Sequence, residues 1–253
     1  FNFILYLSLL SFIFINVVFY RIAEHGTDRS AQILILILII ELLLMVNFFD
    51  LNLYKDRVNK ILIVIGIAVS LKAFYILYLL FLIYLIFFLY KKINLYKIVR
   101  ENITCFFLLF FLITLVLITN VQNSACLIYP VKLTCFSGLP WAFSEQELTL
   151  MGTHYENWAK GGSGPGYKVA MDPKIYIQNF NWVGNWIKVY FAEKGVNTSL
   201  GILSISIITI FTFYSKKRSF PKKRMYWPIL FIIFLLFAEW FWKHPSFRYG
   251  GFS

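Results

Sequence analysis

The chain has 253 residues, of which 60% are apolar, 20% aromatic and only 14% charged. A soluble domain carries about 25% charged residues, so the composition excludes an ordinary soluble fold. The formal net charge of +12 is compatible in principle with a nucleic-acid partner. The basic residues, however, lie in short turns between apolar runs, which is the pattern that the positive-inside rule produces. We therefore expect an integral membrane protein whose partner is membrane lipid, with no nucleic acid.

Long apolar runs predict several membrane-spanning helices. A helix needs roughly 20 apolar residues to cross a hydrocarbon core about 30 Å thick, and only helices or closed barrels satisfy their backbone hydrogen bonds in lipid. Residues 33–40 are uniformly apolar, whereas a barrel strand alternates apolar and polar residues. The predicted fold class is therefore an all-α, polytopic integral membrane protein. The predicted spans are residues 1–20, 31–49, 61–90, 103–119, 198–214 and 226–242.

One long polar segment, residues 120–197, divides the chain into three parts. We expect transmembrane helices over 1–119, one large extracytoplasmic loop with two helices over 120–197, and further transmembrane helices with the start of another outer segment over 198–253. The chain begins at Phe1, and no signal-peptide pattern precedes its first apolar run. We expect it to be an internal fragment of a longer membrane protein.

The apolar run 61–90 is interrupted only by Lys72. As one helix, at 1.5 Å per residue, it would be about 45 Å long and would exceed the thickness of the membrane core. Short basic turns face the cytoplasm, and the three basic turns reach one side only if 61–90 forms a hairpin of two short half-spans that turns near Ser70-Leu-Lys72. One tilted span is the alternative, and it would separate the turns. The hairpin leaves 120–197 outside; the three turns are 50–60, 91–100 and 216–224.

The segment 120–197 contains a strong helix-start signal. Ser144 is followed three residues later by Glu147, which makes a capping box. We therefore predict a helix over about 145–160. The glycine-rich run 161–166 is expected to end this helix as a flexible loop, because it lacks the Lys-Ser/Thr that follows a phosphate-binding glycine loop.

A second helix is predicted to begin at Pro173. Asp172 matches an N-cap residue and Pro173 a first-turn proline, and the helix is expected to end near Gly195. Aromatic rings with a polar handle favour the boundary between lipid and water. We expect this helix to lie along the outer membrane surface; its aromatic residues are Tyr176, Phe180, Trp182, Trp186 and Tyr190.

Two of the three cysteines lie close together in the outer segment. Outside a bacterial inner membrane, in an oxidising compartment, Cys126 and Cys135 are predicted to form a disulfide. Two free buried thiols are the alternative. Two cysteines and one distant histidine do not make a zinc site, so no metal site is predicted there. Cys105 lies in a predicted span and is expected to be an apolar filler.

Charged residues within or beside the spans are candidates for function, because a charge in hydrocarbon is costly. Lys72 either binds an anionic headgroup or phosphate, or extends to the outer surface as a structural anchor. Glu41 lies in the middle of a predicted span. It either has a function or pairs with a polar group in a part of the protein outside the chain.

Two outer segments carry further candidates. Arg21, His25 and Asp28 lie in one short polar connector, which is either an acid/base or anion-binding cluster or an ordinary solvated turn. In the C-terminal tail, Arg248 suits the recognition of a phosphate group, because a guanidinium donates two parallel hydrogen bonds to it.

Three motifs together resemble the GT-C superfamily of membrane glycosyltransferases, which includes protein O-mannosyltransferases and aminoarabinose transferases. Residues 65–72, Ile-Gly-Ile-Ala-Val-Ser-Leu-Lys, are similar to the Gly-Leu-Ala run of that family that reaches Thr-Lys. Here Ser70 and Leu71 replace the usual approach to the lysine. Two arginine motifs of the family also have counterparts, namely Arg21 to Asp28 before a span and Arg248-Tyr249 after an outer segment.

The resemblance implies transfer of a sugar from a polyprenyl-phosphate donor to an extracytoplasmic lipid or glycan, with inversion at the sugar carbon. In that family a carboxylate acts as general base on the acceptor. The carboxylate lies in a first outer loop, which is expected to precede this chain, so Asp28 is a candidate for a secondary acidic role. The cofactor is left open, with a divalent metal ion as one option. The implied substrate-binding residues are Lys72, Arg248, Tyr249, Arg21 and His25.

Two other functions compete with a glycosyltransferase. An O-antigen polymerase or ligase also combines many spans with a large outer loop and uses two lipid-linked glycans. A transporter or structural membrane protein is the third reading, although transporters tend to show repeated halves with broken helices, and this sequence shows no repeat. The segment 120–197 is interpreted as a lid or acceptor platform above a site near Asp28, Lys72 and Arg248.

Overall fold

The computed structural model of the chain describes most of the predicted helices and the outer segment. It is mostly helical, which confirms the helical part of the predicted fold class. Three helices are long and apolar enough to cross a membrane, and they cover Asp28–Asn47, Ala73–Tyr90 and Ile103–Ser124. The described residues are 3–18, 27–164, 167–192, 203–204, 206–207, 210–211 and 227–246.

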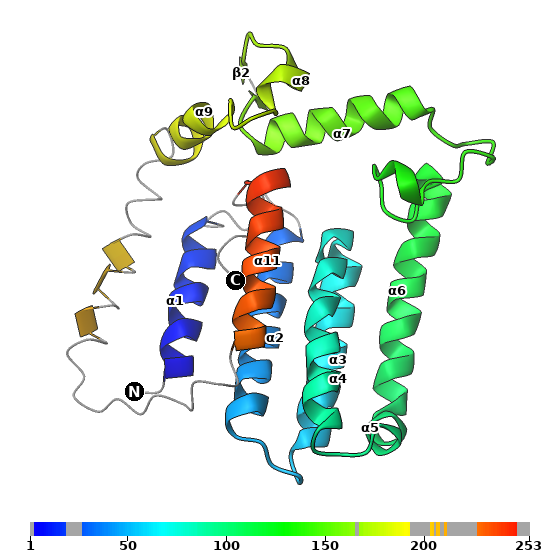
Figure 1. Cartoon of the computed structure of the whole chain (residues 1–253), viewed down its shortest axis with the longest axis vertical. Helices are drawn as coiled ribbons and strands as arrows, with labels where there is room; N and C mark the ends of the chain where they lie inside the picture. Colours follow the sequence, from blue (N-terminus) through cyan, green and yellow to red (C-terminus); the bar gives the residue numbers. More distant parts are fainter. Residues whose placement is uncertain are drawn as a thin grey trace.

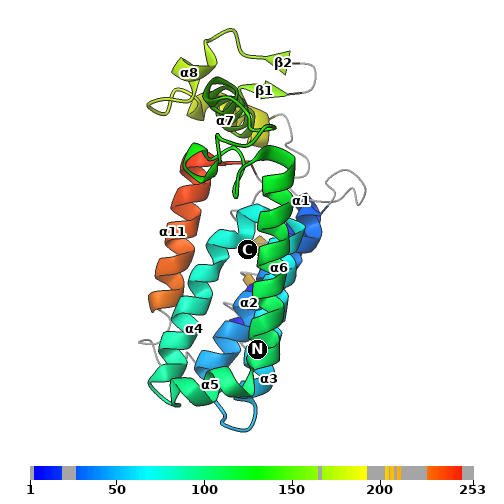
Figure 2. The same cartoon turned by 90° about the vertical axis from the view of Figure 1, so that its right-hand side faces the viewer.

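The long helices run alongside one another and form one bundle (Figures 1 and 2). Helix α3 packs against α2 on one side and against α6 on the other, while α11 packs against α4. The helices of the bundle are α1 (Phe3–Val18), α2 (Asp28–Asn47), α3 (Tyr54–Leu71), α4 (Leu80–Tyr90), α6 (Ile103–Ser124) and α11 (Trp227–Lys243).

Different segments of the chain lie at the two ends of the bundle. Residues 125–164 and 167–192 lie at one end, which we call the loop end (Figure 1). The opposite end, which we call the basic end, is formed by residues 48–53 and 91–102. Helix α5 (Leu95–Glu101) lies across the basic end (Figure 2). The predicted basic turns at 50–60 and 91–100 therefore share one end of the bundle, and the outer segment lies at the other.

The chain reverses at Lys72. Helix α3 ends at Leu71, and Lys72 has an extended backbone (φ −158°, ψ 119°). A 3₁₀ helix, η1 (Ala73–Leu79), then leads back into α4. The run 61–90 therefore contains two helical segments joined at its one charged residue, Lys72. The prediction of short half-spans is wrong in length, because Ala73–Tyr90 alone is long and apolar enough to cross a membrane. Gly66 lets α3 approach α6 closely, because a Cβ there would lie 3.1 Å from Leu112 Cδ1.

Two sequence expectations at the basic end need correction. The segment 50–60 is not a connector throughout, because α3 already begins at Tyr54. Glu41 also has its partners within this chain: its carboxylate lies 3.4 Å from Arg57 Nη1 and 3.8 Å from Lys60 Nζ, both on α3. Two of the three basic residues of this segment, Arg57 and Lys60, therefore face a carboxylate of α2 from the first two turns of α3.

The capping box at Ser144 is confirmed. The Ser144 hydroxyl accepts a hydrogen bond from the backbone N–H of Glu147, and the Glu147 carboxylate accepts one from the backbone N–H of Ser144. Helix α7 (Glu145–Ala159) follows and lies across the loop end of the bundle (Figure 1). The glycine-rich run continues into a small antiparallel hairpin of β1 (Ser163–Gly164) and β2 (Tyr167–Lys168).

The prediction of one long aromatic helix from Pro173 to Gly195 is wrong. The segment forms α8 (Pro173–Tyr176), α9 (Val183–Ile187) and a π-helical turn, η3 (Lys188–Ala192). Asn179 and Phe180 have positive φ angles (49° and 61°) and break the helix between α8 and α9. Four of the five aromatic side chains lie in a buried cluster that also includes a residue of α11, while Phe180 stays exposed. The cluster contains Tyr176, Trp182, Trp186, Val189, Tyr190 and Trp240.

Most of the predicted span 198–214 and all of the basic turn 216–224 lie outside the described residues. The span predicted at 226–242 corresponds to α11, and the span at 103–119 to α6, which continues to Ser124.

Gly162 is expected to be required where α7 packs against the aromatic segment, because there is no space for a side chain. A Cβ at this position would lie 2.0 Å from Asn157 Oδ1 and 2.6 Å from Tyr176 Cε1. Because the neighbours are buried, Gly162→Ala should lower the free energy of unfolding by about 1–3 kcal/mol. The measurement is the thermal unfolding midpoint in detergent. Gly184→Ala is the control, since a Cβ there has no atom within 4 Å; equal midpoints for the two variants would contradict the packing.

Candidate functional site

The structure brings two predicted site residues together at the loop end. The Lys72 ammonium forms an ion pair and hydrogen bond with the Asp28 carboxylate. Asp28 is almost fully buried, with 2% of its surface exposed. The Lys72 side chain is 23% exposed, so the pair can be reached from the lysine side. A buried pair of this kind holds a carboxylate and a cation in contact at the edge of an apolar bundle.

The ends of two helices stabilise this pair. Asp28 is the first residue of α2, where the helix dipole favours a negative charge. Lys72 directly follows the last residue of α3, where the dipole favours a positive charge. The Thr27 hydroxyl donates to the Leu71 carbonyl oxygen (3.1 Å), which satisfies one of the carbonyls that the end of α3 leaves free. The sequence thus supplies opposite charges to two helix ends that meet.

Two uncharged polar side chains lie next to the pair within the bundle. Gln32 follows Asp28 by one turn of α2 and is fully buried (0% exposed). Tyr75 follows Lys72 in η1, is 1% exposed, and its hydroxyl is close enough to Asp28 to interact with it electrostatically. Among the described residues, neither amide atom of Gln32 nor the Tyr75 hydroxyl has a hydrogen-bond partner.

A second polar cluster joins α7 to α11. The Glu156 carboxylate lies 2.6 Å from Lys160 Nζ and 3.2 Å from Lys243 Nζ. Lys160 is buried (2% exposed), also donates to the Ile177 carbonyl oxygen (3.0 Å), and lies over the Trp182 ring. Burial lowers the pKa of Lys160, although its hydrogen bond to Glu156 opposes this shift. We call residues 125–164 and 167–192, which lie at the loop end, the cap. Glu156 therefore connects the cap to the end of α11.

His244 lies between the two clusters. Its ring contacts the Phe74 ring edge-on, with centroids 5.5 Å apart, and Phe74 is two residues from Lys72. Burial lowers the pKa of His244; Glu156 opposes the shift, and Lys243 and Lys160 add to it. The contact aligns the end of α11 with the helix break at Lys72.

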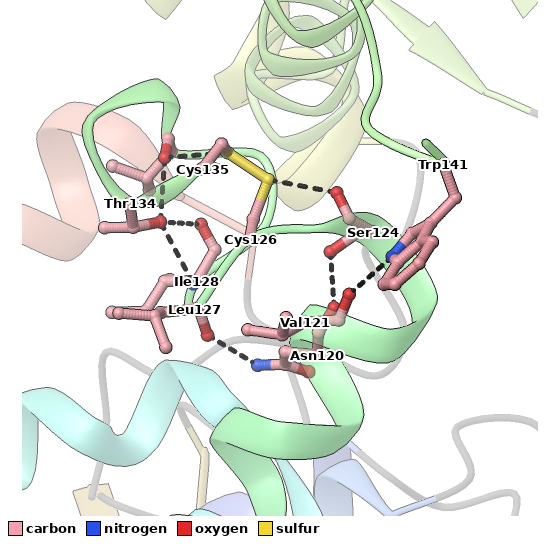
Figure 3. The surroundings of a disulfide bond; sticks show 10 residues. Asn120, Val121, Ser124, Cys126, Leu127, Ile128, Thr134, Cys135 and Trp141 are labelled. Carbon is pink, nitrogen blue, oxygen red and sulfur yellow. Dashed lines mark hydrogen bonds between the residues drawn. A yellow bond between two sulfur atoms is a disulfide. The ribbon is translucent and has the colours of Figure 1, made fainter. Parts of the chain in front are cut away.

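The disulfide region forms the connection between α6 and α7 (Figure 3). Cys126 and Cys135 are joined by a disulfide bond. The Asn120 side chain donates to the Leu127 carbonyl oxygen (2.8 Å), and the Trp141 indole donates to the Val121 carbonyl oxygen (3.0 Å) (Figure 3). These contacts fix the closed loop on the last turns of α6. Cys105 is a free, half-buried cysteine in α6.

The remaining predicted substrate-binding residues lie outside the described part of the chain. They are Arg21, His25, Arg248 and Tyr249. Within that part, no group of three or more His, Cys, Asp and Glu side chains is placed to hold a metal ion.

Sequence reasoning missed the polar groups around the two clusters. Gln32 was an available signal, because it is an uncharged polar residue one turn after Asp28 in a predicted span. The pair Glu156 and Lys160 was also available from its i, i+4 spacing on the predicted helix. No sequence signal indicated that Lys160 is buried, because burial depends on the fold of the aromatic segment above it.

A family model described as a domain of unknown function (DUF8201) matches residues 1–252. No curated protein and no solved structure matches the chain.

Removing the Glu156 charge should destabilise the cap. In Glu156→Gln, the buried Lys160 ammonium loses its charged partner, and we expect the free energy of unfolding to fall by about 2–3 kcal/mol. Glu145→Gln is the matched control, since it removes a carboxylate from the same helix that pairs with Lys132 at the surface and should change stability by less than about 1 kcal/mol. Chemical denaturation of both variants tests this, and a similar loss in both would exclude a special role for Glu156.

Acid should destabilise the fold through His244. Its pKa is lowered in the folded state from the ordinary value of 6.5, so below pH 6.5 the unfolded chain binds the proton more readily. Stability attributable to this residue is therefore present above pH 6.5 and falls as the pH decreases below it. We expect the unfolding midpoint of His244→Gln to fall less than that of the wild type between about pH 7.5 and 5. Parallel curves for the two proteins would contradict this assignment.

Proposed function

The chain belongs to the family described as a domain of unknown function (DUF8201), and we propose that it is part of a polytopic membrane glycosyltransferase. In this proposal, the loop end binds a polyprenyl-phosphate-linked sugar and transfers the sugar to a lipid or glycan acceptor. The observation that carries the proposal is the buried ion pair of Asp28 and Lys72 at the end of an apolar bundle. It supplies the carboxylate and the cation that such a transfer needs.

The membrane orientation has two lines of support. Of the described helices, three are apolar enough to span a bilayer, and the basic segments 50–60 and 91–100 share one end of the bundle, as cytoplasmic segments do. The disulfide of Cys126 and Cys135 lies at the opposite end and suits an oxidising compartment. We propose a bacterial inner membrane with the loop end outside.

Lys72 is proposed to bind the phosphate of the donor lipid. Its ammonium lies at a helix break in the outer part of the bundle, and its side chain is the more exposed member of the pair. A lipid phosphate is an anion, so it competes with Asp28 for the same ammonium group. Binding of the donor would therefore release the Asp28 carboxylate. In the transfer, Lys72 would also stabilise the charge of the departing polyprenyl phosphate.

The resemblance implied only a secondary role for Asp28, but its contact with Lys72 leads us to propose that Asp28 acts as the general base once it is released. The acceptor hydroxyl gives its proton to the carboxylate while its oxygen forms a bond to the anomeric carbon of the sugar. The bond between that carbon and the phosphate oxygen breaks, and polyprenyl phosphate leaves with the bonding electrons. The cap over this site, which Glu156 ties to α11, is proposed to exclude water or to receive the acceptor.

Substitution of the pair should separate the two roles. Lys72→Met should weaken binding of polyprenyl phosphate about tenfold or more. Asp28→Asn should retain that binding and lower release of polyprenyl phosphate from a lipid-linked sugar by about 10²-fold or more. The measurements use the full-length protein in vesicles with a panel of polyprenyl-phosphate hexoses and pentoses.

Glu41→Gln is the matched control. Like Asp28, Glu41 is a carboxylate of α2 that pairs with a basic residue at one end of α3. Unlike Asp28, Glu41 lies toward the basic end. We expect Glu41→Gln to retain both binding and turnover. If Asp28→Asn and Lys72→Met only lower thermal stability, as Glu41→Gln does, the pair is a structural tie and the proposed function is wrong.

A further inference from the structure

We infer that Gln32 and Tyr75 form a subsite for the hydroxyl groups of the transferred sugar. The inference rests on the proposed function, because it assigns a neighbour to the phosphate position at Lys72. Gln32 and Tyr75 lie in predicted apolar spans, and neither takes part in the contact between Asp28 and Lys72.

The two side chains lie at matching depth in the bundle. Gln32 is four residues beyond Asp28 in α2, which at 1.5 Å per residue is about 6 Å from the loop end. Tyr75 is three residues beyond Lys72 in a 3₁₀ helix, which at about 2 Å per residue is also about 6 Å. Gln32 thus lies one turn beyond Asp28, and Tyr75 one turn beyond Lys72, with its hydroxyl close enough to Asp28 to interact with it electrostatically. One hexose ring spans roughly this one-turn separation.

Both side chains keep hydrogen-bonding capacity that the described residues do not use. The Gln32 amide has an unpartnered donor nitrogen and an unpartnered acceptor oxygen, and the Tyr75 hydroxyl is unpartnered as well. Buried polar atoms without partners cost free energy, and the great majority in native proteins are satisfied. A ligand that supplies hydrogen-bond partners for these atoms removes this free-energy cost, so the position is a candidate binding site.

The donor and acceptor pattern favours hydroxyl groups over a second phosphate. An ionised phosphate only accepts hydrogen bonds, so it would leave the Gln32 carbonyl oxygen unsatisfied and repelled. Adjacent sugar hydroxyls both donate and accept, and they can pair with the two ends of one amide. The Tyr75 hydroxyl can likewise donate or accept. The chemistry of the subsite is thus complementary to a polyol.

Access to the subsite is coupled to the ion pair. Gln32 and Tyr75 are almost completely covered in this structure, whereas the Lys72 side chain is 23% exposed. Separation of Lys72 from Asp28 by the donor phosphate would open the path to Gln32 and Tyr75. The sugar is then bound only after its phosphate has engaged Lys72.

The test compares two probes in the full-length protein: polyprenyl phosphate, and polyprenyl phosphate that carries a hexose. Gln32→Met and Tyr75→Phe remove the unpartnered atoms with little change of shape. We expect each variant to bind the hexose-bearing lipid about tenfold less tightly and the sugar-free lipid as the wild type does. The unliganded variants should unfold at the same or a higher temperature, because a polar group without a partner has been removed.

The control is Asn59→Leu, which removes a buried unpartnered amide oxygen of α3 in its first turns, toward the basic end. It should leave the affinities for both lipids unchanged. If wild-type protein binds neither lipid, the proposed function fails together with this inference. If wild-type protein binds both lipids, and Gln32→Met weakens neither or both equally, only the sugar subsite is wrong. A lower unfolding temperature for unliganded Gln32→Met would identify Gln32 as a structural residue and also overturn the inference.

Discussion

The cost of burying charge is the constraint on which the arrangement of this bundle depends. Asp28 is almost fully buried and Lys72 is partly buried, so the charge of each is compensated by the other. The compensation works because one begins a helix and the other follows the end of a helix, with the dipoles oriented to suit both charges. The position of Lys72 thereby fixes where the apolar run 61–90 reverses.

In the cap, a second buried charge is also compensated by an opposite charge. Lys160 is buried beneath an aromatic cluster and is compensated by Glu156, which also reaches Lys243 at the end of α11. The cap is therefore attached to the helix whose end contacts the Lys72 region through His244 and Phe74. Movement of α11 and movement of the cap are expected to be linked, which suits a site that must open to a lipid and then exclude water.

The features predictable from the sequence are those set by local chemistry. Apolar runs gave the helices, the capping box gave the start of α7, and the positions of Asp28 and Lys72 beside predicted spans indicated where charges gather. The aromatic segment was misjudged, because periodicity from Pro173 onward suits one helix, whereas burial of the tryptophans against α11 is more favourable and turns the backbone at Asn179 and Phe180. The contact between Asp28 and Lys72 depends on how α2 packs against α3, and spacing along the chain carries no information about that packing.

The most direct test of the central claim is a structure of the full-length protein with polyprenyl phosphate bound. We expect the phosphate oxygens at about 3 Å from Lys72 Nζ, with the Asp28 carboxylate separated from the lysine and turned toward the space for an acceptor. A lipid phosphate bound elsewhere, with Asp28 and Lys72 still in contact, would show that the pair only holds α2 and α3 together and that the proposed function is wrong.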